Sequence, residues 1–179
     1  MGTGLIIIDI IIVAIVILPF ALFINGSKKR SRELRNALKT EATEHNCKLD
    51  KLEIHGNYAI GVDTSQQKLF FHRKTETSVY SKVIDLSTVM SCKTTKETKR
   101  VKDKTNHYDV VEKIGLSFYH REQNNDAYVE FYDNDLMILS DQLEVAQNWQ
   151  DFLNQLLSSK DHTLNIQNQK HRVIAVNAS

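Results

Sequence analysis

The chain has 179 residues, a formal net charge of +1 and 41% hydrophobic residues, which is enough for one ordinary globular domain with additions. Its two cysteines, Cys47 and Cys92, are too few for a disulfide scaffold and lack zinc or redox spacing, so we expect free thiols in a reducing compartment. The charge is uneven: residues 28–104 carry 18 Lys or Arg and 10 Asp or Glu, whereas residues 105–179 carry 5 and 11.

Residues 5–24 form the apolar run LIIIDIIIVAIVILPFALFI. Twenty helical residues span about 30 Å, the thickness of the hydrocarbon core of a bilayer. The sequence therefore predicts one transmembrane helix within residues 1–26. A cleaved signal peptide is less favoured, because MGTG places no basic residue before the run. Pro19 is expected to kink or end the helix.

One carboxylate, Asp9, interrupts the run four residues from its start. It is either an interfacial residue tolerated near a helix end or a polar contact with a partner transmembrane helix.

A basic cluster follows the apolar run. Short Lys and Arg clusters beside a transmembrane helix stay on the cytoplasmic side. The sequence thus predicts a single-pass protein of the inner (cytoplasmic) membrane, with its N-terminus outside and its C-terminal domain in the cytoplasm. The residues expected to orient it are Lys28, Lys29, Arg30, Arg32 and Arg35.

Residues 27–46 predict a weakly amphipathic juxtamembrane helix, because Leu34, Ala37, Leu38 and Ala42 recur at helical spacing. Its narrow apolar stripe favours packing against the following domain or self-pairing, which leaves a homo-oligomer open. A solvated stalk is the alternative.

Residues 47–159 change to the period of two that is typical of strands. YAIGVD and KLFFHRK, joined by TSQQ, predict one hairpin; SVYSKVIDLSTVMSCK predicts a bent third strand. VVEKIGLSFYHR and AYVEFYD predict a second hairpin, and LMIL is a candidate for one further short strand.

The last predicted element is an amphipathic helix in SDQLEVAQNWQDFLNQLLSS, with Ser140 or Asp141 as its N-cap. We expect Trp149 to lie in the core beneath this helix. Residues 160–179 are polar and rich in Asn and Gln, which predicts a flexible tail.

The order of these elements, with the DLSTVMSC strand and the terminal VAQNWQDFLNQLL helix, resembles the pleckstrin-homology-like (PH-like) fold. The resemblance implies an α+β domain in which an antiparallel β-sandwich or open barrel is closed by a C-terminal amphipathic helix. With its anchor, the chain also resembles small bacterial membrane-anchored proteins of unassigned role. Inositol-phosphate binding in the PH family uses a basic pattern across the first hairpin. Here that hairpin has only Lys68, Arg73 and Lys74, so the pattern is not met.

The sequence contains no GxSxG, P-loop, HExxH or Rossmann motif, and its seven histidines lack metal-ligand spacing. We therefore expect no enzyme, no catalytic or metal site and no cofactor.

The segment KTTKETKRVKDK is the strongest candidate for a contact surface, and it is expected to form an extended hairpin tip. Such a tip could rest on anionic lipid or bind an acidic partner, with a solubilising loop as the alternative. Nucleic acid is not expected, because no aromatic residues interleave with the lysines. The candidate residues are Lys93, Lys96, Lys99, Arg100, Lys102 and Lys104.

Together these patterns predict a membrane-anchored, non-catalytic binding or scaffold module at the cytoplasmic membrane surface. Its expected partners are the lipid bilayer and a protein that the sequence does not identify. The alternative is a structural subunit of a larger membrane complex, assembled through the transmembrane helix and the stalk.

Overall fold

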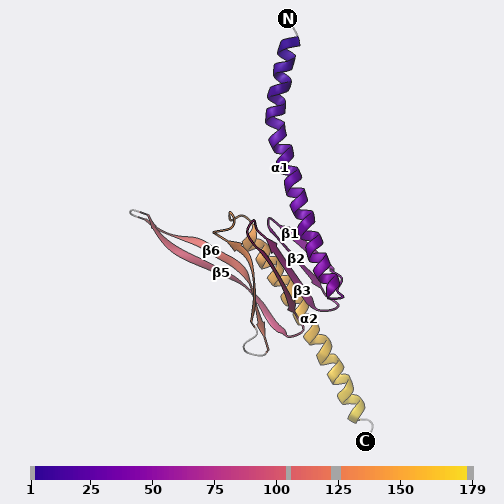
Figure 1. The fold of residues 1–179 in the computed structure, drawn as a ribbon. Coiled ribbons are helices and arrows are strands. Elements are labelled where there is room, and N and C mark those ends of the chain that lie inside the picture. The colour runs from indigo at the N-terminus through magenta and orange to yellow at the C-terminus, as the bar shows by residue number, and fades with distance from the viewer. Residues whose placement is uncertain (1–2, 104–105, 122–125, 177–179) are drawn as a thin grey trace.

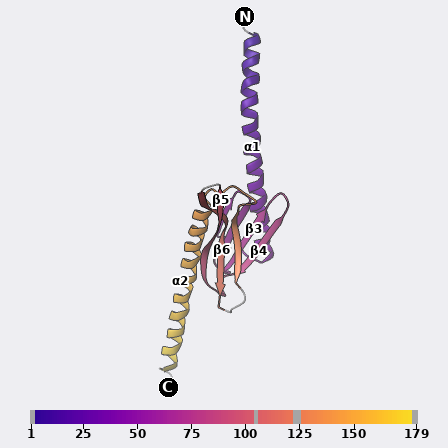
Figure 2. The ribbon, with the colours of Figure 1, turned by 90° about the vertical axis from the view of Figure 1, so that its left-hand side faces the viewer.

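The computed structural model describes residues 3–103, 106–121 and 126–176, with the side chains of residues 3–10, 18, 20–25, 103, 106 and 160–176 outside that description. Within this part the chain is an α+β protein with two helices and two antiparallel sheets (Figure 1). Figure 2 shows the two helices extending from the strands in opposite directions.

Helix α1 (Thr3–Glu44) is continuous, so the predicted juxtamembrane helix is its second half and not a separate element. Pro19 lies inside α1 and does not end it. The helix ends where Asn46 adopts a left-handed conformation (φ 55°) and the Cys47 N–H donates to the Ala42 carbonyl at 2.8 Å. This six-to-one hydrogen bond is that of a Schellman C-cap, a conformation that Asn tolerates better than most residues.

The expectation of a transmembrane helix is wrong for the residues that the structure describes. In that part of the chain no helix is long and apolar enough to cross a membrane. The predicted single-pass placement in the inner membrane is contradicted by the same finding. The orienting role of the basic residues 28–35 stays a prediction.

Four strands form the first sheet in the order β1-β2-β3-β4, each antiparallel to the next. The predicted hairpin of residues 58–74 is present as β2 and β3, with Tyr58 opposite Arg73. Strand β1 precedes this hairpin and was not predicted. The bounds are β1 Lys51–His55, β2 Tyr58–Asp63, β3 Lys68–Lys74 and β4 Val79–Asp85.

Three strands form the second sheet in the order β5-β6-β7. The predicted bent strand of residues 78–93 is divided between the sheets, because the chain leaves β4 at Asp85 and enters β5 at Val89. Residues 136–139, the candidate for a further strand, form no strand. The bounds are β5 Val89–Asp103, β6 Asn106–His120 and β7 Ala127–Asp133.

Helix α2 (Gln142–Val176) begins directly after the predicted N-cap residue Asp141, whose carbonyl accepts from the Val145 N–H at 3.0 Å. Helix α2 continues to Val176, so the backbone of residues 160–176 is helical, although the sequence predicts a flexible tail from residue 160. Residues 177–179 lie outside the described part. The predicted apolar face is buried: Ala146, Trp149 and Leu153 are fully covered by the inner faces of both sheets. This is the main core.

A second, smaller core lies on the other face of the first sheet. Leu34 and Leu38 of α1 are fully buried there and pack with Ala59 and Phe70 from β2 and β3. Because alternate residues of a strand point to opposite faces, the sheet is covered by α2 and the second sheet on one side and by α1 on the other. The second half of α1 is therefore part of the folded domain and not a solvated stalk.

The carboxylate of Asp63 joins the start of the first sheet to the β2–β3 turn. It is 1% exposed and accepts hydrogen bonds from the Lys48 N–H at 2.7 Å, the Ser65 hydroxyl at 2.6 Å and the Gln66 N–H at 2.8 Å. Burial alone would raise its pKa, but these donors outweigh burial and lower the pKa to about 2.

We expect Asp63→Asn to lower the free energy of unfolding by about 2 kcal/mol at neutral pH, because hydrogen bonds to a charged group are lost. The carboxylate has a lower pKa when folded than when unfolded, so its contribution is present above about pH 4 and is lost as pH falls towards about 2. Urea titrations between pH 7 and pH 2 measure this, with the exposed Asp151→Asn as control. A difference in the free energy of unfolding between the wild type and Asp63→Asn that stays the same at all pH values would contradict this prediction.

Candidate functional site

The predicted basic segment lies on β5, in a long hairpin with β6. The two strands pair from Val89 opposite His120 to Asp103 opposite Asn106, with register shifts between Val89 and Ser91 and between Glu97 and Thr98, so the predicted extended hairpin is present. Figure 1 shows the far half of this hairpin extending beyond the core.

The basic side chains of β5 divide between the two faces of the hairpin, because side chains alternate along a strand. Lys96, Arg100 and Lys102 lie on the face that begins with the core residue Cys92, while Lys93 and Lys99 lie on the other. All five basic side chains are exposed. They therefore form a basic rim around the hairpin rather than one flat patch.

Two of these five residues have acidic neighbours on β6. Lys99 Nζ lies 3.3 Å from a Glu112 carboxylate oxygen, and Arg100 Nε lies 3.5 Å from an Asp109 carboxylate oxygen. Both basic side chains are more than two thirds exposed, so these pairs contribute little to stability. Lys93 extends over the ring of Tyr119, with Nζ 5.7 Å from the ring centre.

The basic residues of α1 form a second exposed group. Arg30 lies one turn before the buried Leu34, on the side of α1 that faces the domain, and it lines a hollow with Gly26, Ser27 and Gly56. The other members of this group are exposed too: Lys28, Lys29, Arg32 and Arg35.

Two of the predicted residues cannot be placed. The side chain of Asp9 and the whole of Lys104 lie outside the described residues.

Two basic residues of the first hairpin, Arg73 and Lys74, are engaged in ion pairs. Arg73 Nη1 lies 2.6 Å from Glu130 Oε1, and Lys113 Nζ lies 3.2 Å from the second oxygen of Glu130 and 3.6 Å from Asp133. Lys74 Nζ lies 3.1 Å from Glu33 of α1. Arg73 and Glu130 are 14% and 13% exposed, so their pair connects the two sheets and is not free for an anionic ligand.

A polar cluster lies under the start of α2. The carboxylate of Glu53 accepts from the Trp149 indole N–H at 2.7 Å and lies 3.2 Å from Lys51 Nζ. Burial alone would raise the pKa of Glu53, but these donors and His55 outweigh burial and lower the pKa. A carboxylate held ionised by an indole and an ammonium group is a structural acceptor rather than a proton carrier.

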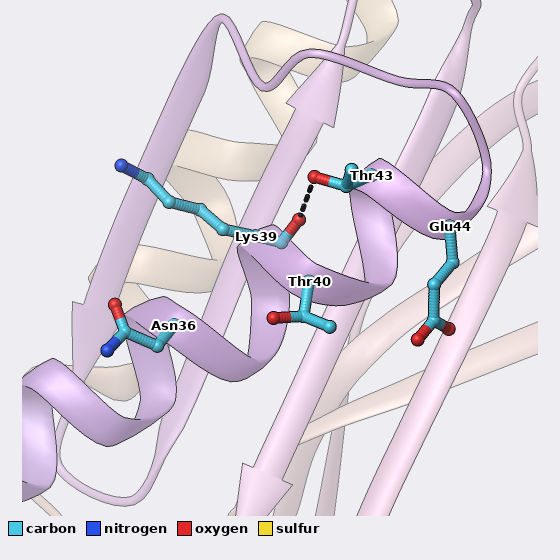
Figure 3. Close-up of a pocket in the computed structure, with 5 residues that line it drawn as sticks. All are labelled: Asn36, Lys39, Thr40, Thr43 and Glu44. Carbon is cyan, nitrogen blue, oxygen red and sulfur yellow. Dashed lines mark hydrogen bonds between the residues drawn. The ribbon is translucent and has the colours of Figure 1, made fainter.

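Helix α1 carries a hollow on its outer surface, lined by Asn36, Lys39, Thr40, Thr43 and Glu44 (Figure 3). The Thr43 hydroxyl donates to the Lys39 carbonyl at 2.8 Å, a contact within the helix itself. The side chains of Lys39 and Glu44 point away from each other, so the hollow gathers no set of groups that could hold a ligand.

Acidic and nucleophilic groups do not assemble into a metal or thiol site in the described residues. No group of three His, Cys, Asp or Glu side chains is arranged there to hold a metal ion. Cys47 and Cys92 are free and buried, and burial raises the pKa of both thiols, that of Cys92 to about 12.

Sequence reasoning missed an exposed apolar loop between β7 and α2, because the run LMIL was interpreted as strand. Its side chains Leu136, Ile138 and Leu139 are 42%, 91% and 41% exposed. The signal in the sequence is the pair of Asp and Asn residues that closes β7 before the run, a pattern typical of turns.

Comparisons of this chain with models of protein families, with curated proteins and with solved structures found no match.

Proposed function

We propose that this chain is a non-catalytic binding module of PH-like architecture that binds an anionic lipid surface through its β5–β6 hairpin. The exposed basic rim of the hairpin carries the proposal. A four-stranded and a three-stranded antiparallel sheet followed by a C-terminal helix support the PH-like architecture.

Electrostatics favour a surface over a small anion as the ligand. The basic residues point to both faces of the hairpin, so they do not converge on one point as a phosphate site requires. A surface of many headgroups can meet all of them, and each Lys or Arg near an anionic bilayer contributes about 1 kcal/mol. Arg73 and Lys74 of the first hairpin, by contrast, are held in ion pairs with Glu130 and Glu33.

The test is binding of the full-length protein to vesicles of phosphatidylglycerol and phosphatidylcholine, compared with phosphatidylcholine alone. The double variant Lys96→Gln/Lys102→Gln removes two charges from the hairpin, and its affinity for the anionic vesicles should fall by about tenfold or more. The matched control is Lys39→Gln/Lys48→Gln, which removes two exposed charges from α1 and the segment before β1 and should bind as the wild type does.

Raising the salt concentration should weaken the wild-type interaction, because exposed charges are screened over about 10 Å at 0.1 M salt. Equal binding to both kinds of vesicle, or equal loss in the hairpin and the control variants, would overturn the proposed function.

A further inference from the structure

The loop between β7 and α2 holds apolar side chains out into solvent. Its first turn is fixed by the Leu136 and Met137 N–H groups, which donate to the Asp133 carbonyl at 3.0 and 3.2 Å. Its last turn is fixed by the Ser140 N–H, which donates to the Gln142 side-chain oxygen at 2.6 Å. Met137 packs against the core, whereas Ile138 beside it is 91% exposed. The loop is thus held at both ends with its most apolar residue exposed.

Basic residues of α1 lie near this loop. The turn between β1 and β2 connects the two: the Met137 methyl group is 3.9 Å from the position of a Cβ on Gly56, and Gly56 lines a hollow with Arg30 of α1. Lys28 and Lys29 precede Arg30 and are exposed. Apolar and basic side chains are therefore neighbours at one end of the domain.

We propose that this end of the domain is a second contact with the anionic lipid surface, in which the apolar loop of residues 136–139 inserts among the lipids while Lys28, Lys29 and Arg30 meet the headgroups. The inference deepens the proposed function and rests on it.

The combination of apolar and basic side chains favours an anionic lipid surface as the partner. Apolar side chains with basic neighbours match the boundary between acyl chains and anionic headgroups, where both kinds of group are satisfied at once. Figure 1 shows the far half of the β5–β6 hairpin extending sideways from the domain, near the end from which α1 leaves it.

The direct test is a fluorescent probe in the loop. The variant Ile138→Cys is labelled with an environment-sensitive dye; Cys47 and Cys92 react slowly because they are buried and their thiol pKa values are raised. On vesicles of phosphatidylglycerol and phosphatidylcholine the emission should shift to the blue, as the dye enters an apolar phase. The same dye on Glu44→Cys, at the other end of the domain part of α1, should not respond.

A pair of polar substitutions gives an independent readout. Ile138→Ser should weaken binding of the full-length chain to these vesicles by about tenfold, because an isoleucine side chain is no longer transferred out of water. Met90→Ser is the matched control, since Met90 is 60% exposed at the start of β5, and it should bind as the wild type does.

The outcomes separate this inference from the proposed function. Vesicle binding that depends on Lys96 and Lys102, but with a silent probe at position 138 and no effect of Ile138→Ser, would overturn the loop insertion alone. Absence of any preference for anionic vesicles would overturn both.

Discussion

Trp149→Ala should lower the free energy of unfolding by about 4 kcal/mol, because it removes the largest fully buried side chain of the core. The indole also packs at a right angle to Phe152 (ring centres 5.7 Å apart) and donates its N–H to Glu53 at 2.7 Å. Without the indole, the half-buried Glu53 carboxylate loses one of its donors, and a cavity remains between the two sheets.

The measurement is urea unfolding followed by far-UV circular dichroism, since Trp149 is the one tryptophan in the chain and its fluorescence is lost with it. Trp149→Phe should cost about half as much, because the ring volume is mostly kept and only the hydrogen bond is lost. Equal stabilities for the alanine variant and the wild type would show that α2 does not hold the sheets together through this residue.

Gly115→Ala should destabilise the second sheet by about 3 kcal/mol, because there is no room for a methyl group. A Cβ at Gly115 would lie 2.3 Å from the Val129 carbonyl oxygen and 2.5 Å from the Tyr128 ring. The glycine is opposite Glu130, directly beside the register shift that follows Ile114. Strand β7 can approach β6 this closely because position 115 has no side chain, and no special backbone angle is involved.

Urea unfolding of two further variants tests the cause. Gly115→Ala/Tyr128→Ala should recover only part of the loss, because the second change removes the ring and leaves the Val129 carbonyl in place. Ser117→Ala is the control on the same face of β6, and it should cost about 1 kcal/mol through its hydrogen bond with the Thr95 hydroxyl. A Gly115→Ala variant as stable as Ser117→Ala would contradict the steric argument.

Periodicity in the sequence predicted strands and helices correctly where one face of the element is buried. The alternation in residues 58–74 and 114–118, and the helical spacing around Trp149, predicted elements that the structure contains. Strand β1 was missed because Lys51, Glu53 and His55 place charged groups on a core-facing side. The Glu53 carboxylate is hydrogen-bonded there by Trp149, which is 96 residues away in the chain.

The failures come from interactions that local pattern does not contain. The division of residues 79–103 into β4 and β5 is decided by which sheet each half pairs with, β4 with β3 and β5 with β6. For the candidate site, the sequence predicted the basic residues of β5 but not their separation onto two faces. The loop that carries Ile138 lies near Arg30 because both contact the turn at Gly56, and no sequence motif predicts this contact.

The small core beneath α1 changes where the independent folding unit begins. Sequence composition placed that boundary at Cys47, but Leu34, Leu38 and Ala42 of α1 are buried in one cluster with Phe70 on this side of the sheet. A fragment cut at the first strand would leave an uncovered apolar sheet face, the kind of surface that drives aggregation. The smallest piece that can be expected to remain monomeric in water therefore starts within α1, before Leu34.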